Sequence, residues 1–386
     1  MDEWNRLTHL GNNFAFFPQD RKKLVPIDRA LAVWLAEPGG PGQVSAAAAA
    51  APPAAMTEHS KGLLEAVYVA CDKWLQDKGA KTSDNAVRRR IAVQKLRDQA
   101  KARLAYVRVP AYRAAYDEFE RNKAAKQAGA YVPPTISLSQ GYTREHYGKG
   151  KGAPRVGATN MGQAMANIKD KSVQEEITKI THGTDDLKKL SFEQYDALEA
   201  YLLKLKGTVY KNRDGEVVCE IRALTYYSKT QRLGHMMVPQ NNRFFDLTGQ
   251  PFSTRDAPDG SKMYIYAIDE YGNFYAEPGV AGLLHHSSFN RGKGVICAGV
   301  IQVANGLPYY ISNESGHYKP STVNLRNAVQ LIHINYRIPT DNMWVIDMTQ
   351  SQNPSKIHFP NGAAFLANQG SAICPKKINM GNPAMP

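Results

Sequence analysis

The apolar residues in the first third of the chain recur at helical spacing. Between Thr57 and Lys78 they lie three or four residues apart, which predicts an amphipathic helix ending near Gly79: Leu64, Val67, Cys71, Trp74 and Leu75. A second helix is expected over residues 85–106, and Pro110 should interrupt it before helical spacing resumes over 112–126. The pattern therefore predicts a helical hairpin or a small bundle.

Further along the chain the spacing becomes that of strands. Ser191 and Gln194 have capping-box spacing at the start of an expected helix over 192–206. Short segments rich in β-branched and aromatic residues follow and predict strands: 208–211, 217–227, 263–268, 273–276, 283–289, 295–303 and 308–311. Asn305-Gly306 is a strong hairpin signal because both residues tolerate a positive φ. With a helix over 322–332 and a strand over 343–348, the fold class predicted is α+β, a helical N-terminal region followed by a mostly antiparallel C-terminal domain.

Changes in composition suggest the domain boundaries. Residues 39–56 consist largely of Ala, Pro and Gly, a composition that cannot build a packed core and predicts a linker. This linker separates an N-terminal segment, 1–38, from a basic helical domain, 57–128. Residues 129–190 include a run rich in Gly, Lys and Tyr and are predicted to be a connector. The C-terminal α+β domain is expected over 191–386.

The net charge of +13 is concentrated in the N-terminal half. Residues 81–108 contain nine Lys or Arg against two Asp, whereas residues 240–348 contain eight basic against nine acidic residues. A nucleic-acid substrate for the C-terminal domain is therefore disfavoured, because polynucleotides select a positive groove. The basic helices either present a solvated face or dock to an acidic partner, such as a chaperone, a delivery protein or a membrane surface.

Several classes of site and segment are excluded. Four widely spaced cysteines, Cys71, Cys219, Cys297 and Cys374, form no zinc ligand ladder and no dense disulfide framework. The N-terminus has neither the basic nor the apolar region of a cleavable secretory signal. No apolar run approaches the length of about 20 residues that a membrane-spanning helix needs. No metal is predicted.

The densest group of reactive side chains lies between Leu283 and Pro320. Two blocks, 286–289 (HSSF) and 315–320 (SGHYKP), carry the candidates for catalysis: His286, Ser287, Ser288, His317 and Tyr318. Imidazoles titrate near neutral pH, so two histidines from separate segments could serve as acid and base. The alternative is that these side chains satisfy backbone groups and fill the core. The catalytic hypothesis requires both blocks to converge on one pocket.

Residues 244–321 resemble a domain found at the C-terminal ends of bacterial polymorphic-type toxins and secreted effectors. The HSSF and SGHYKP blocks carry this resemblance, and a related run is found in plant IQ-motif calmodulin-binding proteins, although this chain shows no IQ-type motif. The N-terminal helices also resemble the leading segments of type VI secretion effectors. The resemblance implies a virulence effector made in the bacterial cytoplasm and secreted into a target cell without a cleavable signal. Delivery machinery or a chaperone, an immunity protein and a target-cell protein would be its partners.

Three hypotheses for the activity follow. The first is an ADP-ribosyltransferase-like transferase using NAD, because Arg222, the Ser287-Ser288 pair and Glu314 occur in the Arg, Ser, Glu order of that class. Lys319 and Gly316 would join Arg222 in binding the cofactor. The second is a non-enzymatic module that binds another protein. The third is a phosphodiesterase in which His286 and His317 act as base and acid and Lys319 stabilises the phosphorane.

Overall fold

The computed structural model describes residues 18–36, 58–78, 84–138, 156–254, 262–280, 282–349 and 357–367. The predicted linker, 39–56, lies outside the described residues. The chain separates into two compact units, Met1–Tyr116 and Asp117–Pro386. Each unit has an apolar core of its own.

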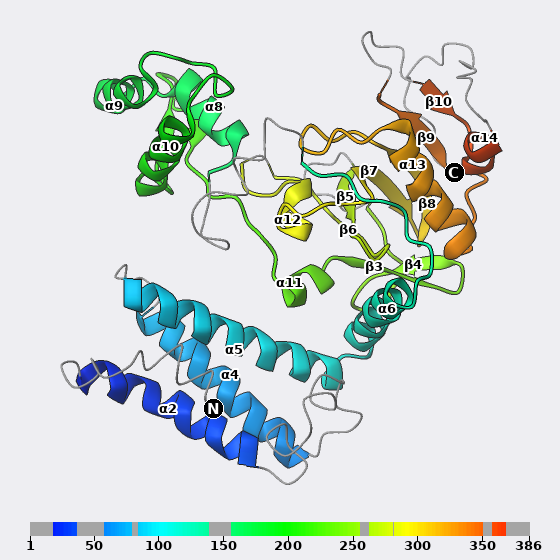
Figure 1. Cartoon of the computed structure of the whole chain (residues 1–386), viewed down its shortest axis with the longest axis horizontal. Coiled ribbons are helices and arrows are strands. Elements are labelled where there is room, and N and C mark those ends of the chain that lie inside the picture. Colours follow the sequence, from blue (N-terminus) through cyan, green and yellow to red (C-terminus); the bar gives the residue numbers. More distant parts are fainter. Residues whose placement is uncertain are drawn as a thin grey trace. The chain divides into compact units, whose positions relative to one another are not determined.

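The described part of the first unit is built mainly from the helices α2 (Pro18–Ala36), α4 (Glu58–Lys78) and α5 (Asp84–Arg108). Figure 1 shows them side by side, with α4 in contact with both neighbours. Their shared core contains Leu24, Ile27 and Leu31 of α2 together with Leu64, Val67, Cys71 and Trp74 of α4, so the helical spacing read over Thr57–Lys78 is confirmed. Pro110 begins the next helix, α6 (Pro110–Gln127), because proline at the first helical position has no hydrogen bond to lose.

The second unit contains a small α-helical part with its own hydrophobic cluster. It comprises α8 (Ala158–Asn167), α9 (Lys171–Thr181), α10 (Phe192–Lys204) and the hairpin of β1 (Val209–Lys211) and β2 (Val217–Glu220). The predicted capping box of α10 is present, since the Ser191 hydroxyl accepts from the Gln194 amide while the Gln194 side chain accepts from the Ser191 amide. Helices α8 and α9 lie in the stretch predicted as a connector, where no helical pattern was recognised.

An eight-stranded sheet forms the rest of the second unit, in the order β10-β9-β8-β7-β5-β6-β3-β4. Its strands are β3 (Met236–Gln240), β4 (Arg243–Phe245), β5 (Tyr264–Ile268), β6 (Phe274–Glu277), β7 (Cys297–Ala304), β8 (Leu307–Ser312), β9 (Trp344–Asp347) and β10 (Ile357–Phe359). All neighbours are antiparallel except β8 and β9, which are parallel. The α+β prediction is confirmed, as is the hairpin at Asn305-Gly306 between β7 and β8.

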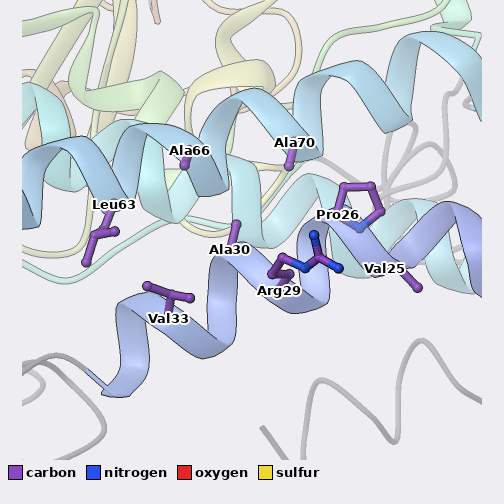
Figure 2. A pocket seen from close by; sticks show the side chains of 8 residues that line it. All are labelled: Val25, Pro26, Arg29, Ala30, Val33, Leu63, Ala66 and Ala70. Atoms are coloured by element: carbon purple, nitrogen blue, oxygen red, sulfur yellow. The ribbon is translucent and has the colours of Figure 1, made fainter.

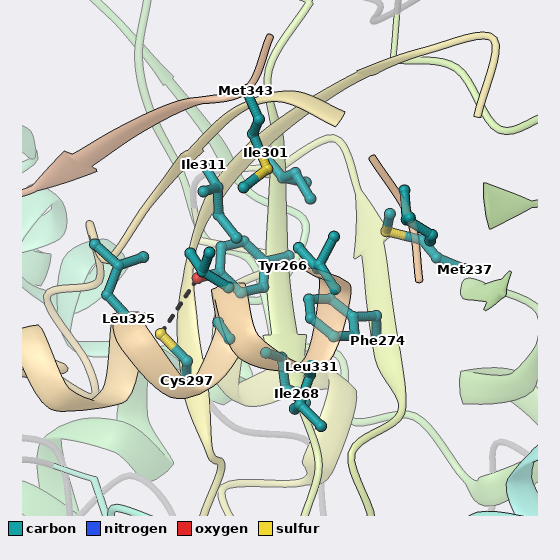
Figure 3. Close-up of a cluster of buried hydrophobic side chains, with 14 of the residues drawn as sticks. Met237, Tyr266, Ile268, Phe274, Cys297, Ile301, Ile311, Leu325, Leu331 and Met343 are labelled. Atoms are coloured by element: carbon teal, nitrogen blue, oxygen red, sulfur yellow. Dashed lines mark hydrogen bonds between the residues drawn. The ribbon is translucent and has the colours of Figure 1, made fainter. Parts of the chain in front are cut away.

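Helix α13 (Thr322–Gln330) and the π-helical turn η2 (Leu331–Asn335) connect the parallel strands β8 and β9 and pack on the sheet. Figure 3 shows the core that results, with Leu325 and Leu331 beside Tyr266 and Phe274 of the strands. The Tyr266 hydroxyl and the Cys297 Sγ atom are 3.2 Å apart. Burial raises the pKa of the Cys297 thiol to about 12, so this cysteine is a protonated core side chain.

The described residues of the second unit also form the short helices α11 (Lys229–Leu233), α12 (His286–Asn290) and α14 (Gly362–Ala367). Helix α12 corrects one prediction, because residues 283–289 were expected to be a strand. The His285 amide donates to the Ser288 hydroxyl at 3.1 Å, a capping contact that starts a helix at this position.

Within the described ranges, none of the helices combines the length and the hydrophobicity that crossing a bilayer requires. The same part of the chain contains no cluster of three or more His, Cys, Asp or Glu side chains arranged to hold a metal ion.

Candidate functional site

Helix α12 carries the HSSF block into the interior of the second unit. All five of its residues are buried, and it contacts the central strand β5. The helix ends at Arg291, which adopts a left-handed conformation with φ 54°, and the Gly292 amide then donates to the Ser287 carbonyl at 2.9 Å. The block is thus one closed helical turn whose side chains face protein.

His286 is bound to the neighbouring strand. Its Nε2 atom lies 2.9 Å from the carbonyl oxygen of Gly299 on β7. A carbonyl only accepts, so Nε2 carries the proton and donates it to Gly299. Burial lowers the pKa of His286 to about 4, and the ring is neutral at physiological pH. This arrangement fixes the position of α12 on the sheet and leaves His286 unsuited to exchanging protons near pH 7.

The two predicted blocks do meet, through a different histidine. The rings of His285 and His317 pack edge to face, with centroids 4.8 Å apart and an interplanar angle of 81°. His285 Nε2 accepts a hydrogen bond from the Gly282 amide at 3.2 Å, and burial lowers the pKa of His285. His317 is only 7% exposed. The sequence suggested that His286 pairs with His317. In the structure the contact of His317 is with His285 instead.

The other predicted catalytic side chains lie at different places around this contact. The Ser288 hydroxyl caps α12, and the Tyr318 hydroxyl donates to the Lys293 carbonyl at 2.8 Å. The Ser287 hydroxyl is buried and has no hydrogen-bond partner among the described residues. Glu314 is exposed, and its backbone amide donates to the Ser312 hydroxyl at 3.4 Å.

The predicted cofactor-binding residues also have structural surroundings of their own. Arg222 lies just after β2, not on a strand as expected, and its Nε donates to Glu220 Oε2 at 2.7 Å. Its backbone amide donates to Asn160 of α8 at 2.9 Å. Lys319 has a positive φ of 47°, and open space surrounds the position where Gly316 would carry a Cβ atom. Of these three residues, Arg222 already has a carboxylate partner, because its guanidinium is paired with Glu220.

A polar cluster that sequence reasoning missed lies against the outer side of α12. Glu277 accepts a hydrogen bond from the Tyr227 hydroxyl at 2.5 Å and pairs with Nδ1 of His235 at 2.7 Å. The rings of Tyr227 and His235 stack with centroids 4.6 Å apart, and Phe289 of α12 packs against both. The Tyr227 amide donates to the Ser288 carbonyl at 3.0 Å, so this cluster holds α12 from its second side.

No local sequence signal marks the cluster of Tyr227, His235 and Glu277. The three residues belong to a loop, the start of β3 and the end of β6, and they meet only because β3 and β6 pair with Met236 opposite Tyr275. Predicting a strand over residues 236–240 could have indicated the cluster. If that strand pairs with β6, His235 lies beside the end of β6, where Glu277 is found.

A second buried polar group centres on Asp269. Its carboxylate accepts from the Tyr275 hydroxyl at 2.8 Å and from the amides of Tyr271 and Asn273 at 2.9 and 3.1 Å. Burial raises the pKa of Asp269, while the Arg232 guanidinium, 5.0 Å above the Tyr275 ring, acts in the opposite direction. These contacts tie the β5–β6 turn to helix α11.

Residues 231–325 match a family model described as the IQ motif-containing protein middle domain. The matched segment runs from α11 into α13 and includes β3 to β8 and α12, so it contains both histidine blocks.

Two curated relatives come from Arabidopsis thaliana. IQ domain-containing protein IQM2 is 25% identical over 115 residues, which is 30% of this chain and 19% of that protein. IQ domain-containing protein IQM3 is 35% identical over 96 residues, which is 23% of this chain and 21% of that protein. The chain thus spans about a fifth of the length of these relatives. No solved structure matches the chain significantly.

These similarities correct the functional predictions. The assignment of residues 244–321 to a bacterial toxin domain is wrong, because the matching family model describes IQ motif-containing proteins and both relatives are IQ domain-containing proteins of a plant. The predictions of a type VI secretion effector, of an ADP-ribosyltransferase-like toxin and of secretion from a bacterial cytoplasm are wrong for the same reason. A delivery machinery and an immunity protein were predicted as partners only because a toxin was predicted, so these two predictions no longer have support. The nine site residues and the NAD cofactor stay untested predictions.

Proposed function

We propose that the chain is a non-enzymatic recognition protein that binds another protein. The similarity of residues 231–325 to the middle domain of IQ motif-containing proteins carries this proposal. In the resemblance described above, the HSSF and SGHYKP blocks are shared with plant IQ-motif calmodulin-binding proteins, and a partner of that kind is a protein surface. The similarity to IQ motif-containing proteins therefore supports a role in binding another protein better than it supports a group-transfer reaction.

The use of the reactive side chains supports the same conclusion. His286 donates to the Gly299 carbonyl, Ser288 caps α12, and Tyr318 donates to the Lys293 carbonyl. A general base has to exchange protons near the working pH, whereas burial holds the pKa of His286 near 4. These residues are consistent with stabilising a domain that presents its surface to a partner.

The charge of the first unit favours an acidic partner. Helix α5 alone carries eight Lys or Arg and two Asp. Arg97 pairs with Asp98 at 2.9 Å and Arg108 with Glu65 at 2.9 Å. Lys95 and Lys101 of the same helix are exposed to solvent. Exposed cations on one helix raise the association rate with a negatively charged protein and make its affinity depend on salt. Calmodulin is acidic and is the first partner to test.

Calorimetric titration of the full chain with calmodulin, with and without Ca²⁺, tests this proposal. Replacing Lys95 and Lys101 by Glu should weaken binding at least about fivefold, since each reversal removes an attraction and adds a repulsion. Replacing the exposed Lys188 and Lys204 of the second unit by Glu is the matched control and should change affinity less than about twofold. Equal weakening by both pairs, or no heat of binding at all, contradicts an acidic partner on α5.

A further inference from the structure

A groove runs between α2 and α4 on the surface of the first unit. It has a volume of about 430 Å³, and Figure 2 shows the side chains of both helices that line it. The lining residues are apolar except for one arginine: Val25, Pro26, Arg29, Ala30, Val33, Leu63, Ala66 and Ala70.

Helix α2 has two apolar faces, of which only one is used by the core. Leu24, Ile27 and Leu31 are buried against the other helices. Val25 and Val33 point away from that core and keep 40% and 49% of their surface exposed. With Arg29 between them, they follow a spacing of four residues along one side of the helix. Apolar side chains exposed together in a groove mark interaction sites more often than isolated ones do.

The opposite wall belongs to α4 and is built from small side chains. Ala66 and Ala70 are four residues apart, and Leu63 precedes them by one turn. Alanines in such positions let the backbone of an additional helix approach closely. The span from Val25 to Val33 measures about 12 Å along the helix axis, which corresponds to slightly more than two helical turns. A third helix is the element that fits a groove of this length between two helices.

The charge in the groove specifies what that helix must carry. Arg29 is exposed and is the one charged residue among those lining the groove. Three carboxylates of the neighbouring α4 have other partners: Glu58 pairs with Lys61, Glu65 with Arg108 and Asp72 with Arg97. No ion pair between Arg29 and a carboxylate occurs in the part of the chain that the structure describes. A carboxylate on the incoming helix would complement this cation.

We infer that the α2–α4 groove binds an amphipathic helix of a partner protein, with apolar anchors at positions i, i+3 and i+7 and a carboxylate at i+4 facing Arg29. Helix-in-groove recognition uses such anchors at one-turn intervals. Lys95 and Lys101 of α5 do not line this groove, so the inference goes beyond the calmodulin-type interaction proposed above and does not depend on it.

Three synthetic helical peptides test the inference against the full chain by fluorescence anisotropy. One has leucines at i, i+3 and i+7 and glutamate at i+4, one has lysine in place of that glutamate, and one has serines in place of the leucines. The glutamate peptide should bind with a Kd of about 10 µM, and the lysine peptide at least about fivefold more weakly. In an Arg29→Glu variant this preference should reverse, because the charge of the groove changes sign.

The second part of the experiment uses a variant in which a larger side chain fills the groove. Ala66→Phe should weaken binding of the glutamate peptide at least about tenfold, because the ring occupies the space of the ligand. Val69→Phe is the matched control, since Val69 is 55% exposed on the same helix and does not line the groove. Circular dichroism and thermal unfolding establish that each variant folds.

Three outcomes would overturn the inference. One is that no peptide binds at about 500 µM. Another is that Arg29→Glu leaves the preference unchanged, or that Val69→Phe weakens binding as much as Ala66→Phe. The third is self-association of the chain that Ala66→Phe abolishes, which would assign the groove to a second copy of the same chain.

Discussion

His286 makes the stability of the second unit depend on pH. Its pKa is about 4 in the folded protein, against 6.5 for a histidine exposed to water in the unfolded chain. Between these values the unfolded chain binds more protons, so stability present above pH 6.5 is lost as the pH falls towards 4. Each unit of difference corresponds to about 1.4 kcal/mol, and the full loss is about 3 kcal/mol.

Replacing His286 by Gln should remove most of this dependence. The glutamine amide can still donate to the Gly299 carbonyl but does not titrate. In urea unfolding the wild type should lose about 2 kcal/mol between pH 7 and pH 5 through this residue, and the variant should lose correspondingly less. His59→Gln, at an exposed position of α4, is the control and should leave the profile unchanged. Parallel profiles for wild type and His286→Gln would show that this ring does not control acid stability.

Gly299 and Gly316 differ sharply in their tolerance of a side chain. A Cβ atom on Gly299 would lie 1.9 Å from the Ser312 carbonyl oxygen and 3.0 Å from the Asn313 Cα atom, whereas one on Gly316 would meet nothing within 4 Å. Gly299→Ala should therefore cost about 3 kcal/mol or more in denaturant unfolding, because β7 and β8 must separate. Gly316→Ala should cost less than about 1 kcal/mol. Similar costs for both variants would contradict the close packing at Gly299.

Sequence reasoning anticipated that the segments around residues 286 and 317 meet, but not that His285 is the histidine in contact with His317. The convergence of the segments around 286 and 317 could be anticipated, because a hairpin and short connections limit how far apart they can lie. Which imidazole meets His317 depends on whether residues 285–289 form a strand or a helix. A single-turn helix leaves no periodic pattern, so the choice between His285 and His286 required the packing of α12 on β5 and β7.

At the scale of elements, the features that depend on neighbouring residues were predicted from the sequence. The Asn305-Gly306 hairpin and the capping box at Ser191 depend on residues next to one another, and both are present. The β3–β4 hairpin was missed because its turn, Asn241-Asn242, lies between short segments with little alternation. The parallel pairing of β8 with β9 follows from the crossover through α13, which no short motif encodes.

Phe119 is the aromatic residue at the centre of several contacts between the C-terminal part of α6 and the rest of the second unit. Phe119 contacts Tyr271 edge to face at 5.5 Å and lies 4.5 Å from the Lys229 ammonium. Asn122 adds a 2.8 Å hydrogen bond to Asn273. Phe119→Ala should therefore loosen the packing of residues 117–127 and raise their amide hydrogen exchange, while the strands stay protected.

Exchange followed by mass spectrometry measures this effect. Tyr131→Ala serves as the control, since Tyr131 is 79% exposed and its removal should change little. If Phe119→Ala left the exchange of residues 117–127 unaffected, Phe119 would not be what anchors the helix.

At the scale of the whole molecule, the helical unit and the eight-stranded sheet have separate hydrophobic cores that mutations should affect separately. Leu64 belongs to the core of the helical unit and Ile301 to that of the sheet, and both are fully buried. Leu64→Ala and Ile301→Ala should each cost about 2–5 kcal/mol in their own unit. Scanning calorimetry should then show two transitions, each lowered by one of the variants. A single transition lowered equally by both would show that the units unfold together.

The family resemblance could be read from sequence only over part of one unit. The match ends at residue 325, within α13, whereas β9 and β10 lie beyond it and extend the same sheet. The first unit lies outside the match altogether, and its groove and basic helix have no counterpart in that comparison. Charge counting located the basic helix, but the groove depends on how α2 and α4 pack and could not be predicted.

The division between Tyr116 and Asp117 falls within α6, a helix that runs without interruption from Pro110 to Gln127. Anyone dissecting the protein at that division would cut through hydrogen-bonded turns and expose two frayed ends. A fragment beginning at Pro110 keeps the whole helix with the sheet and starts on a residue suited to a helix N-terminus. Limited proteolysis should likewise spare this junction, although it marks the border between the two units.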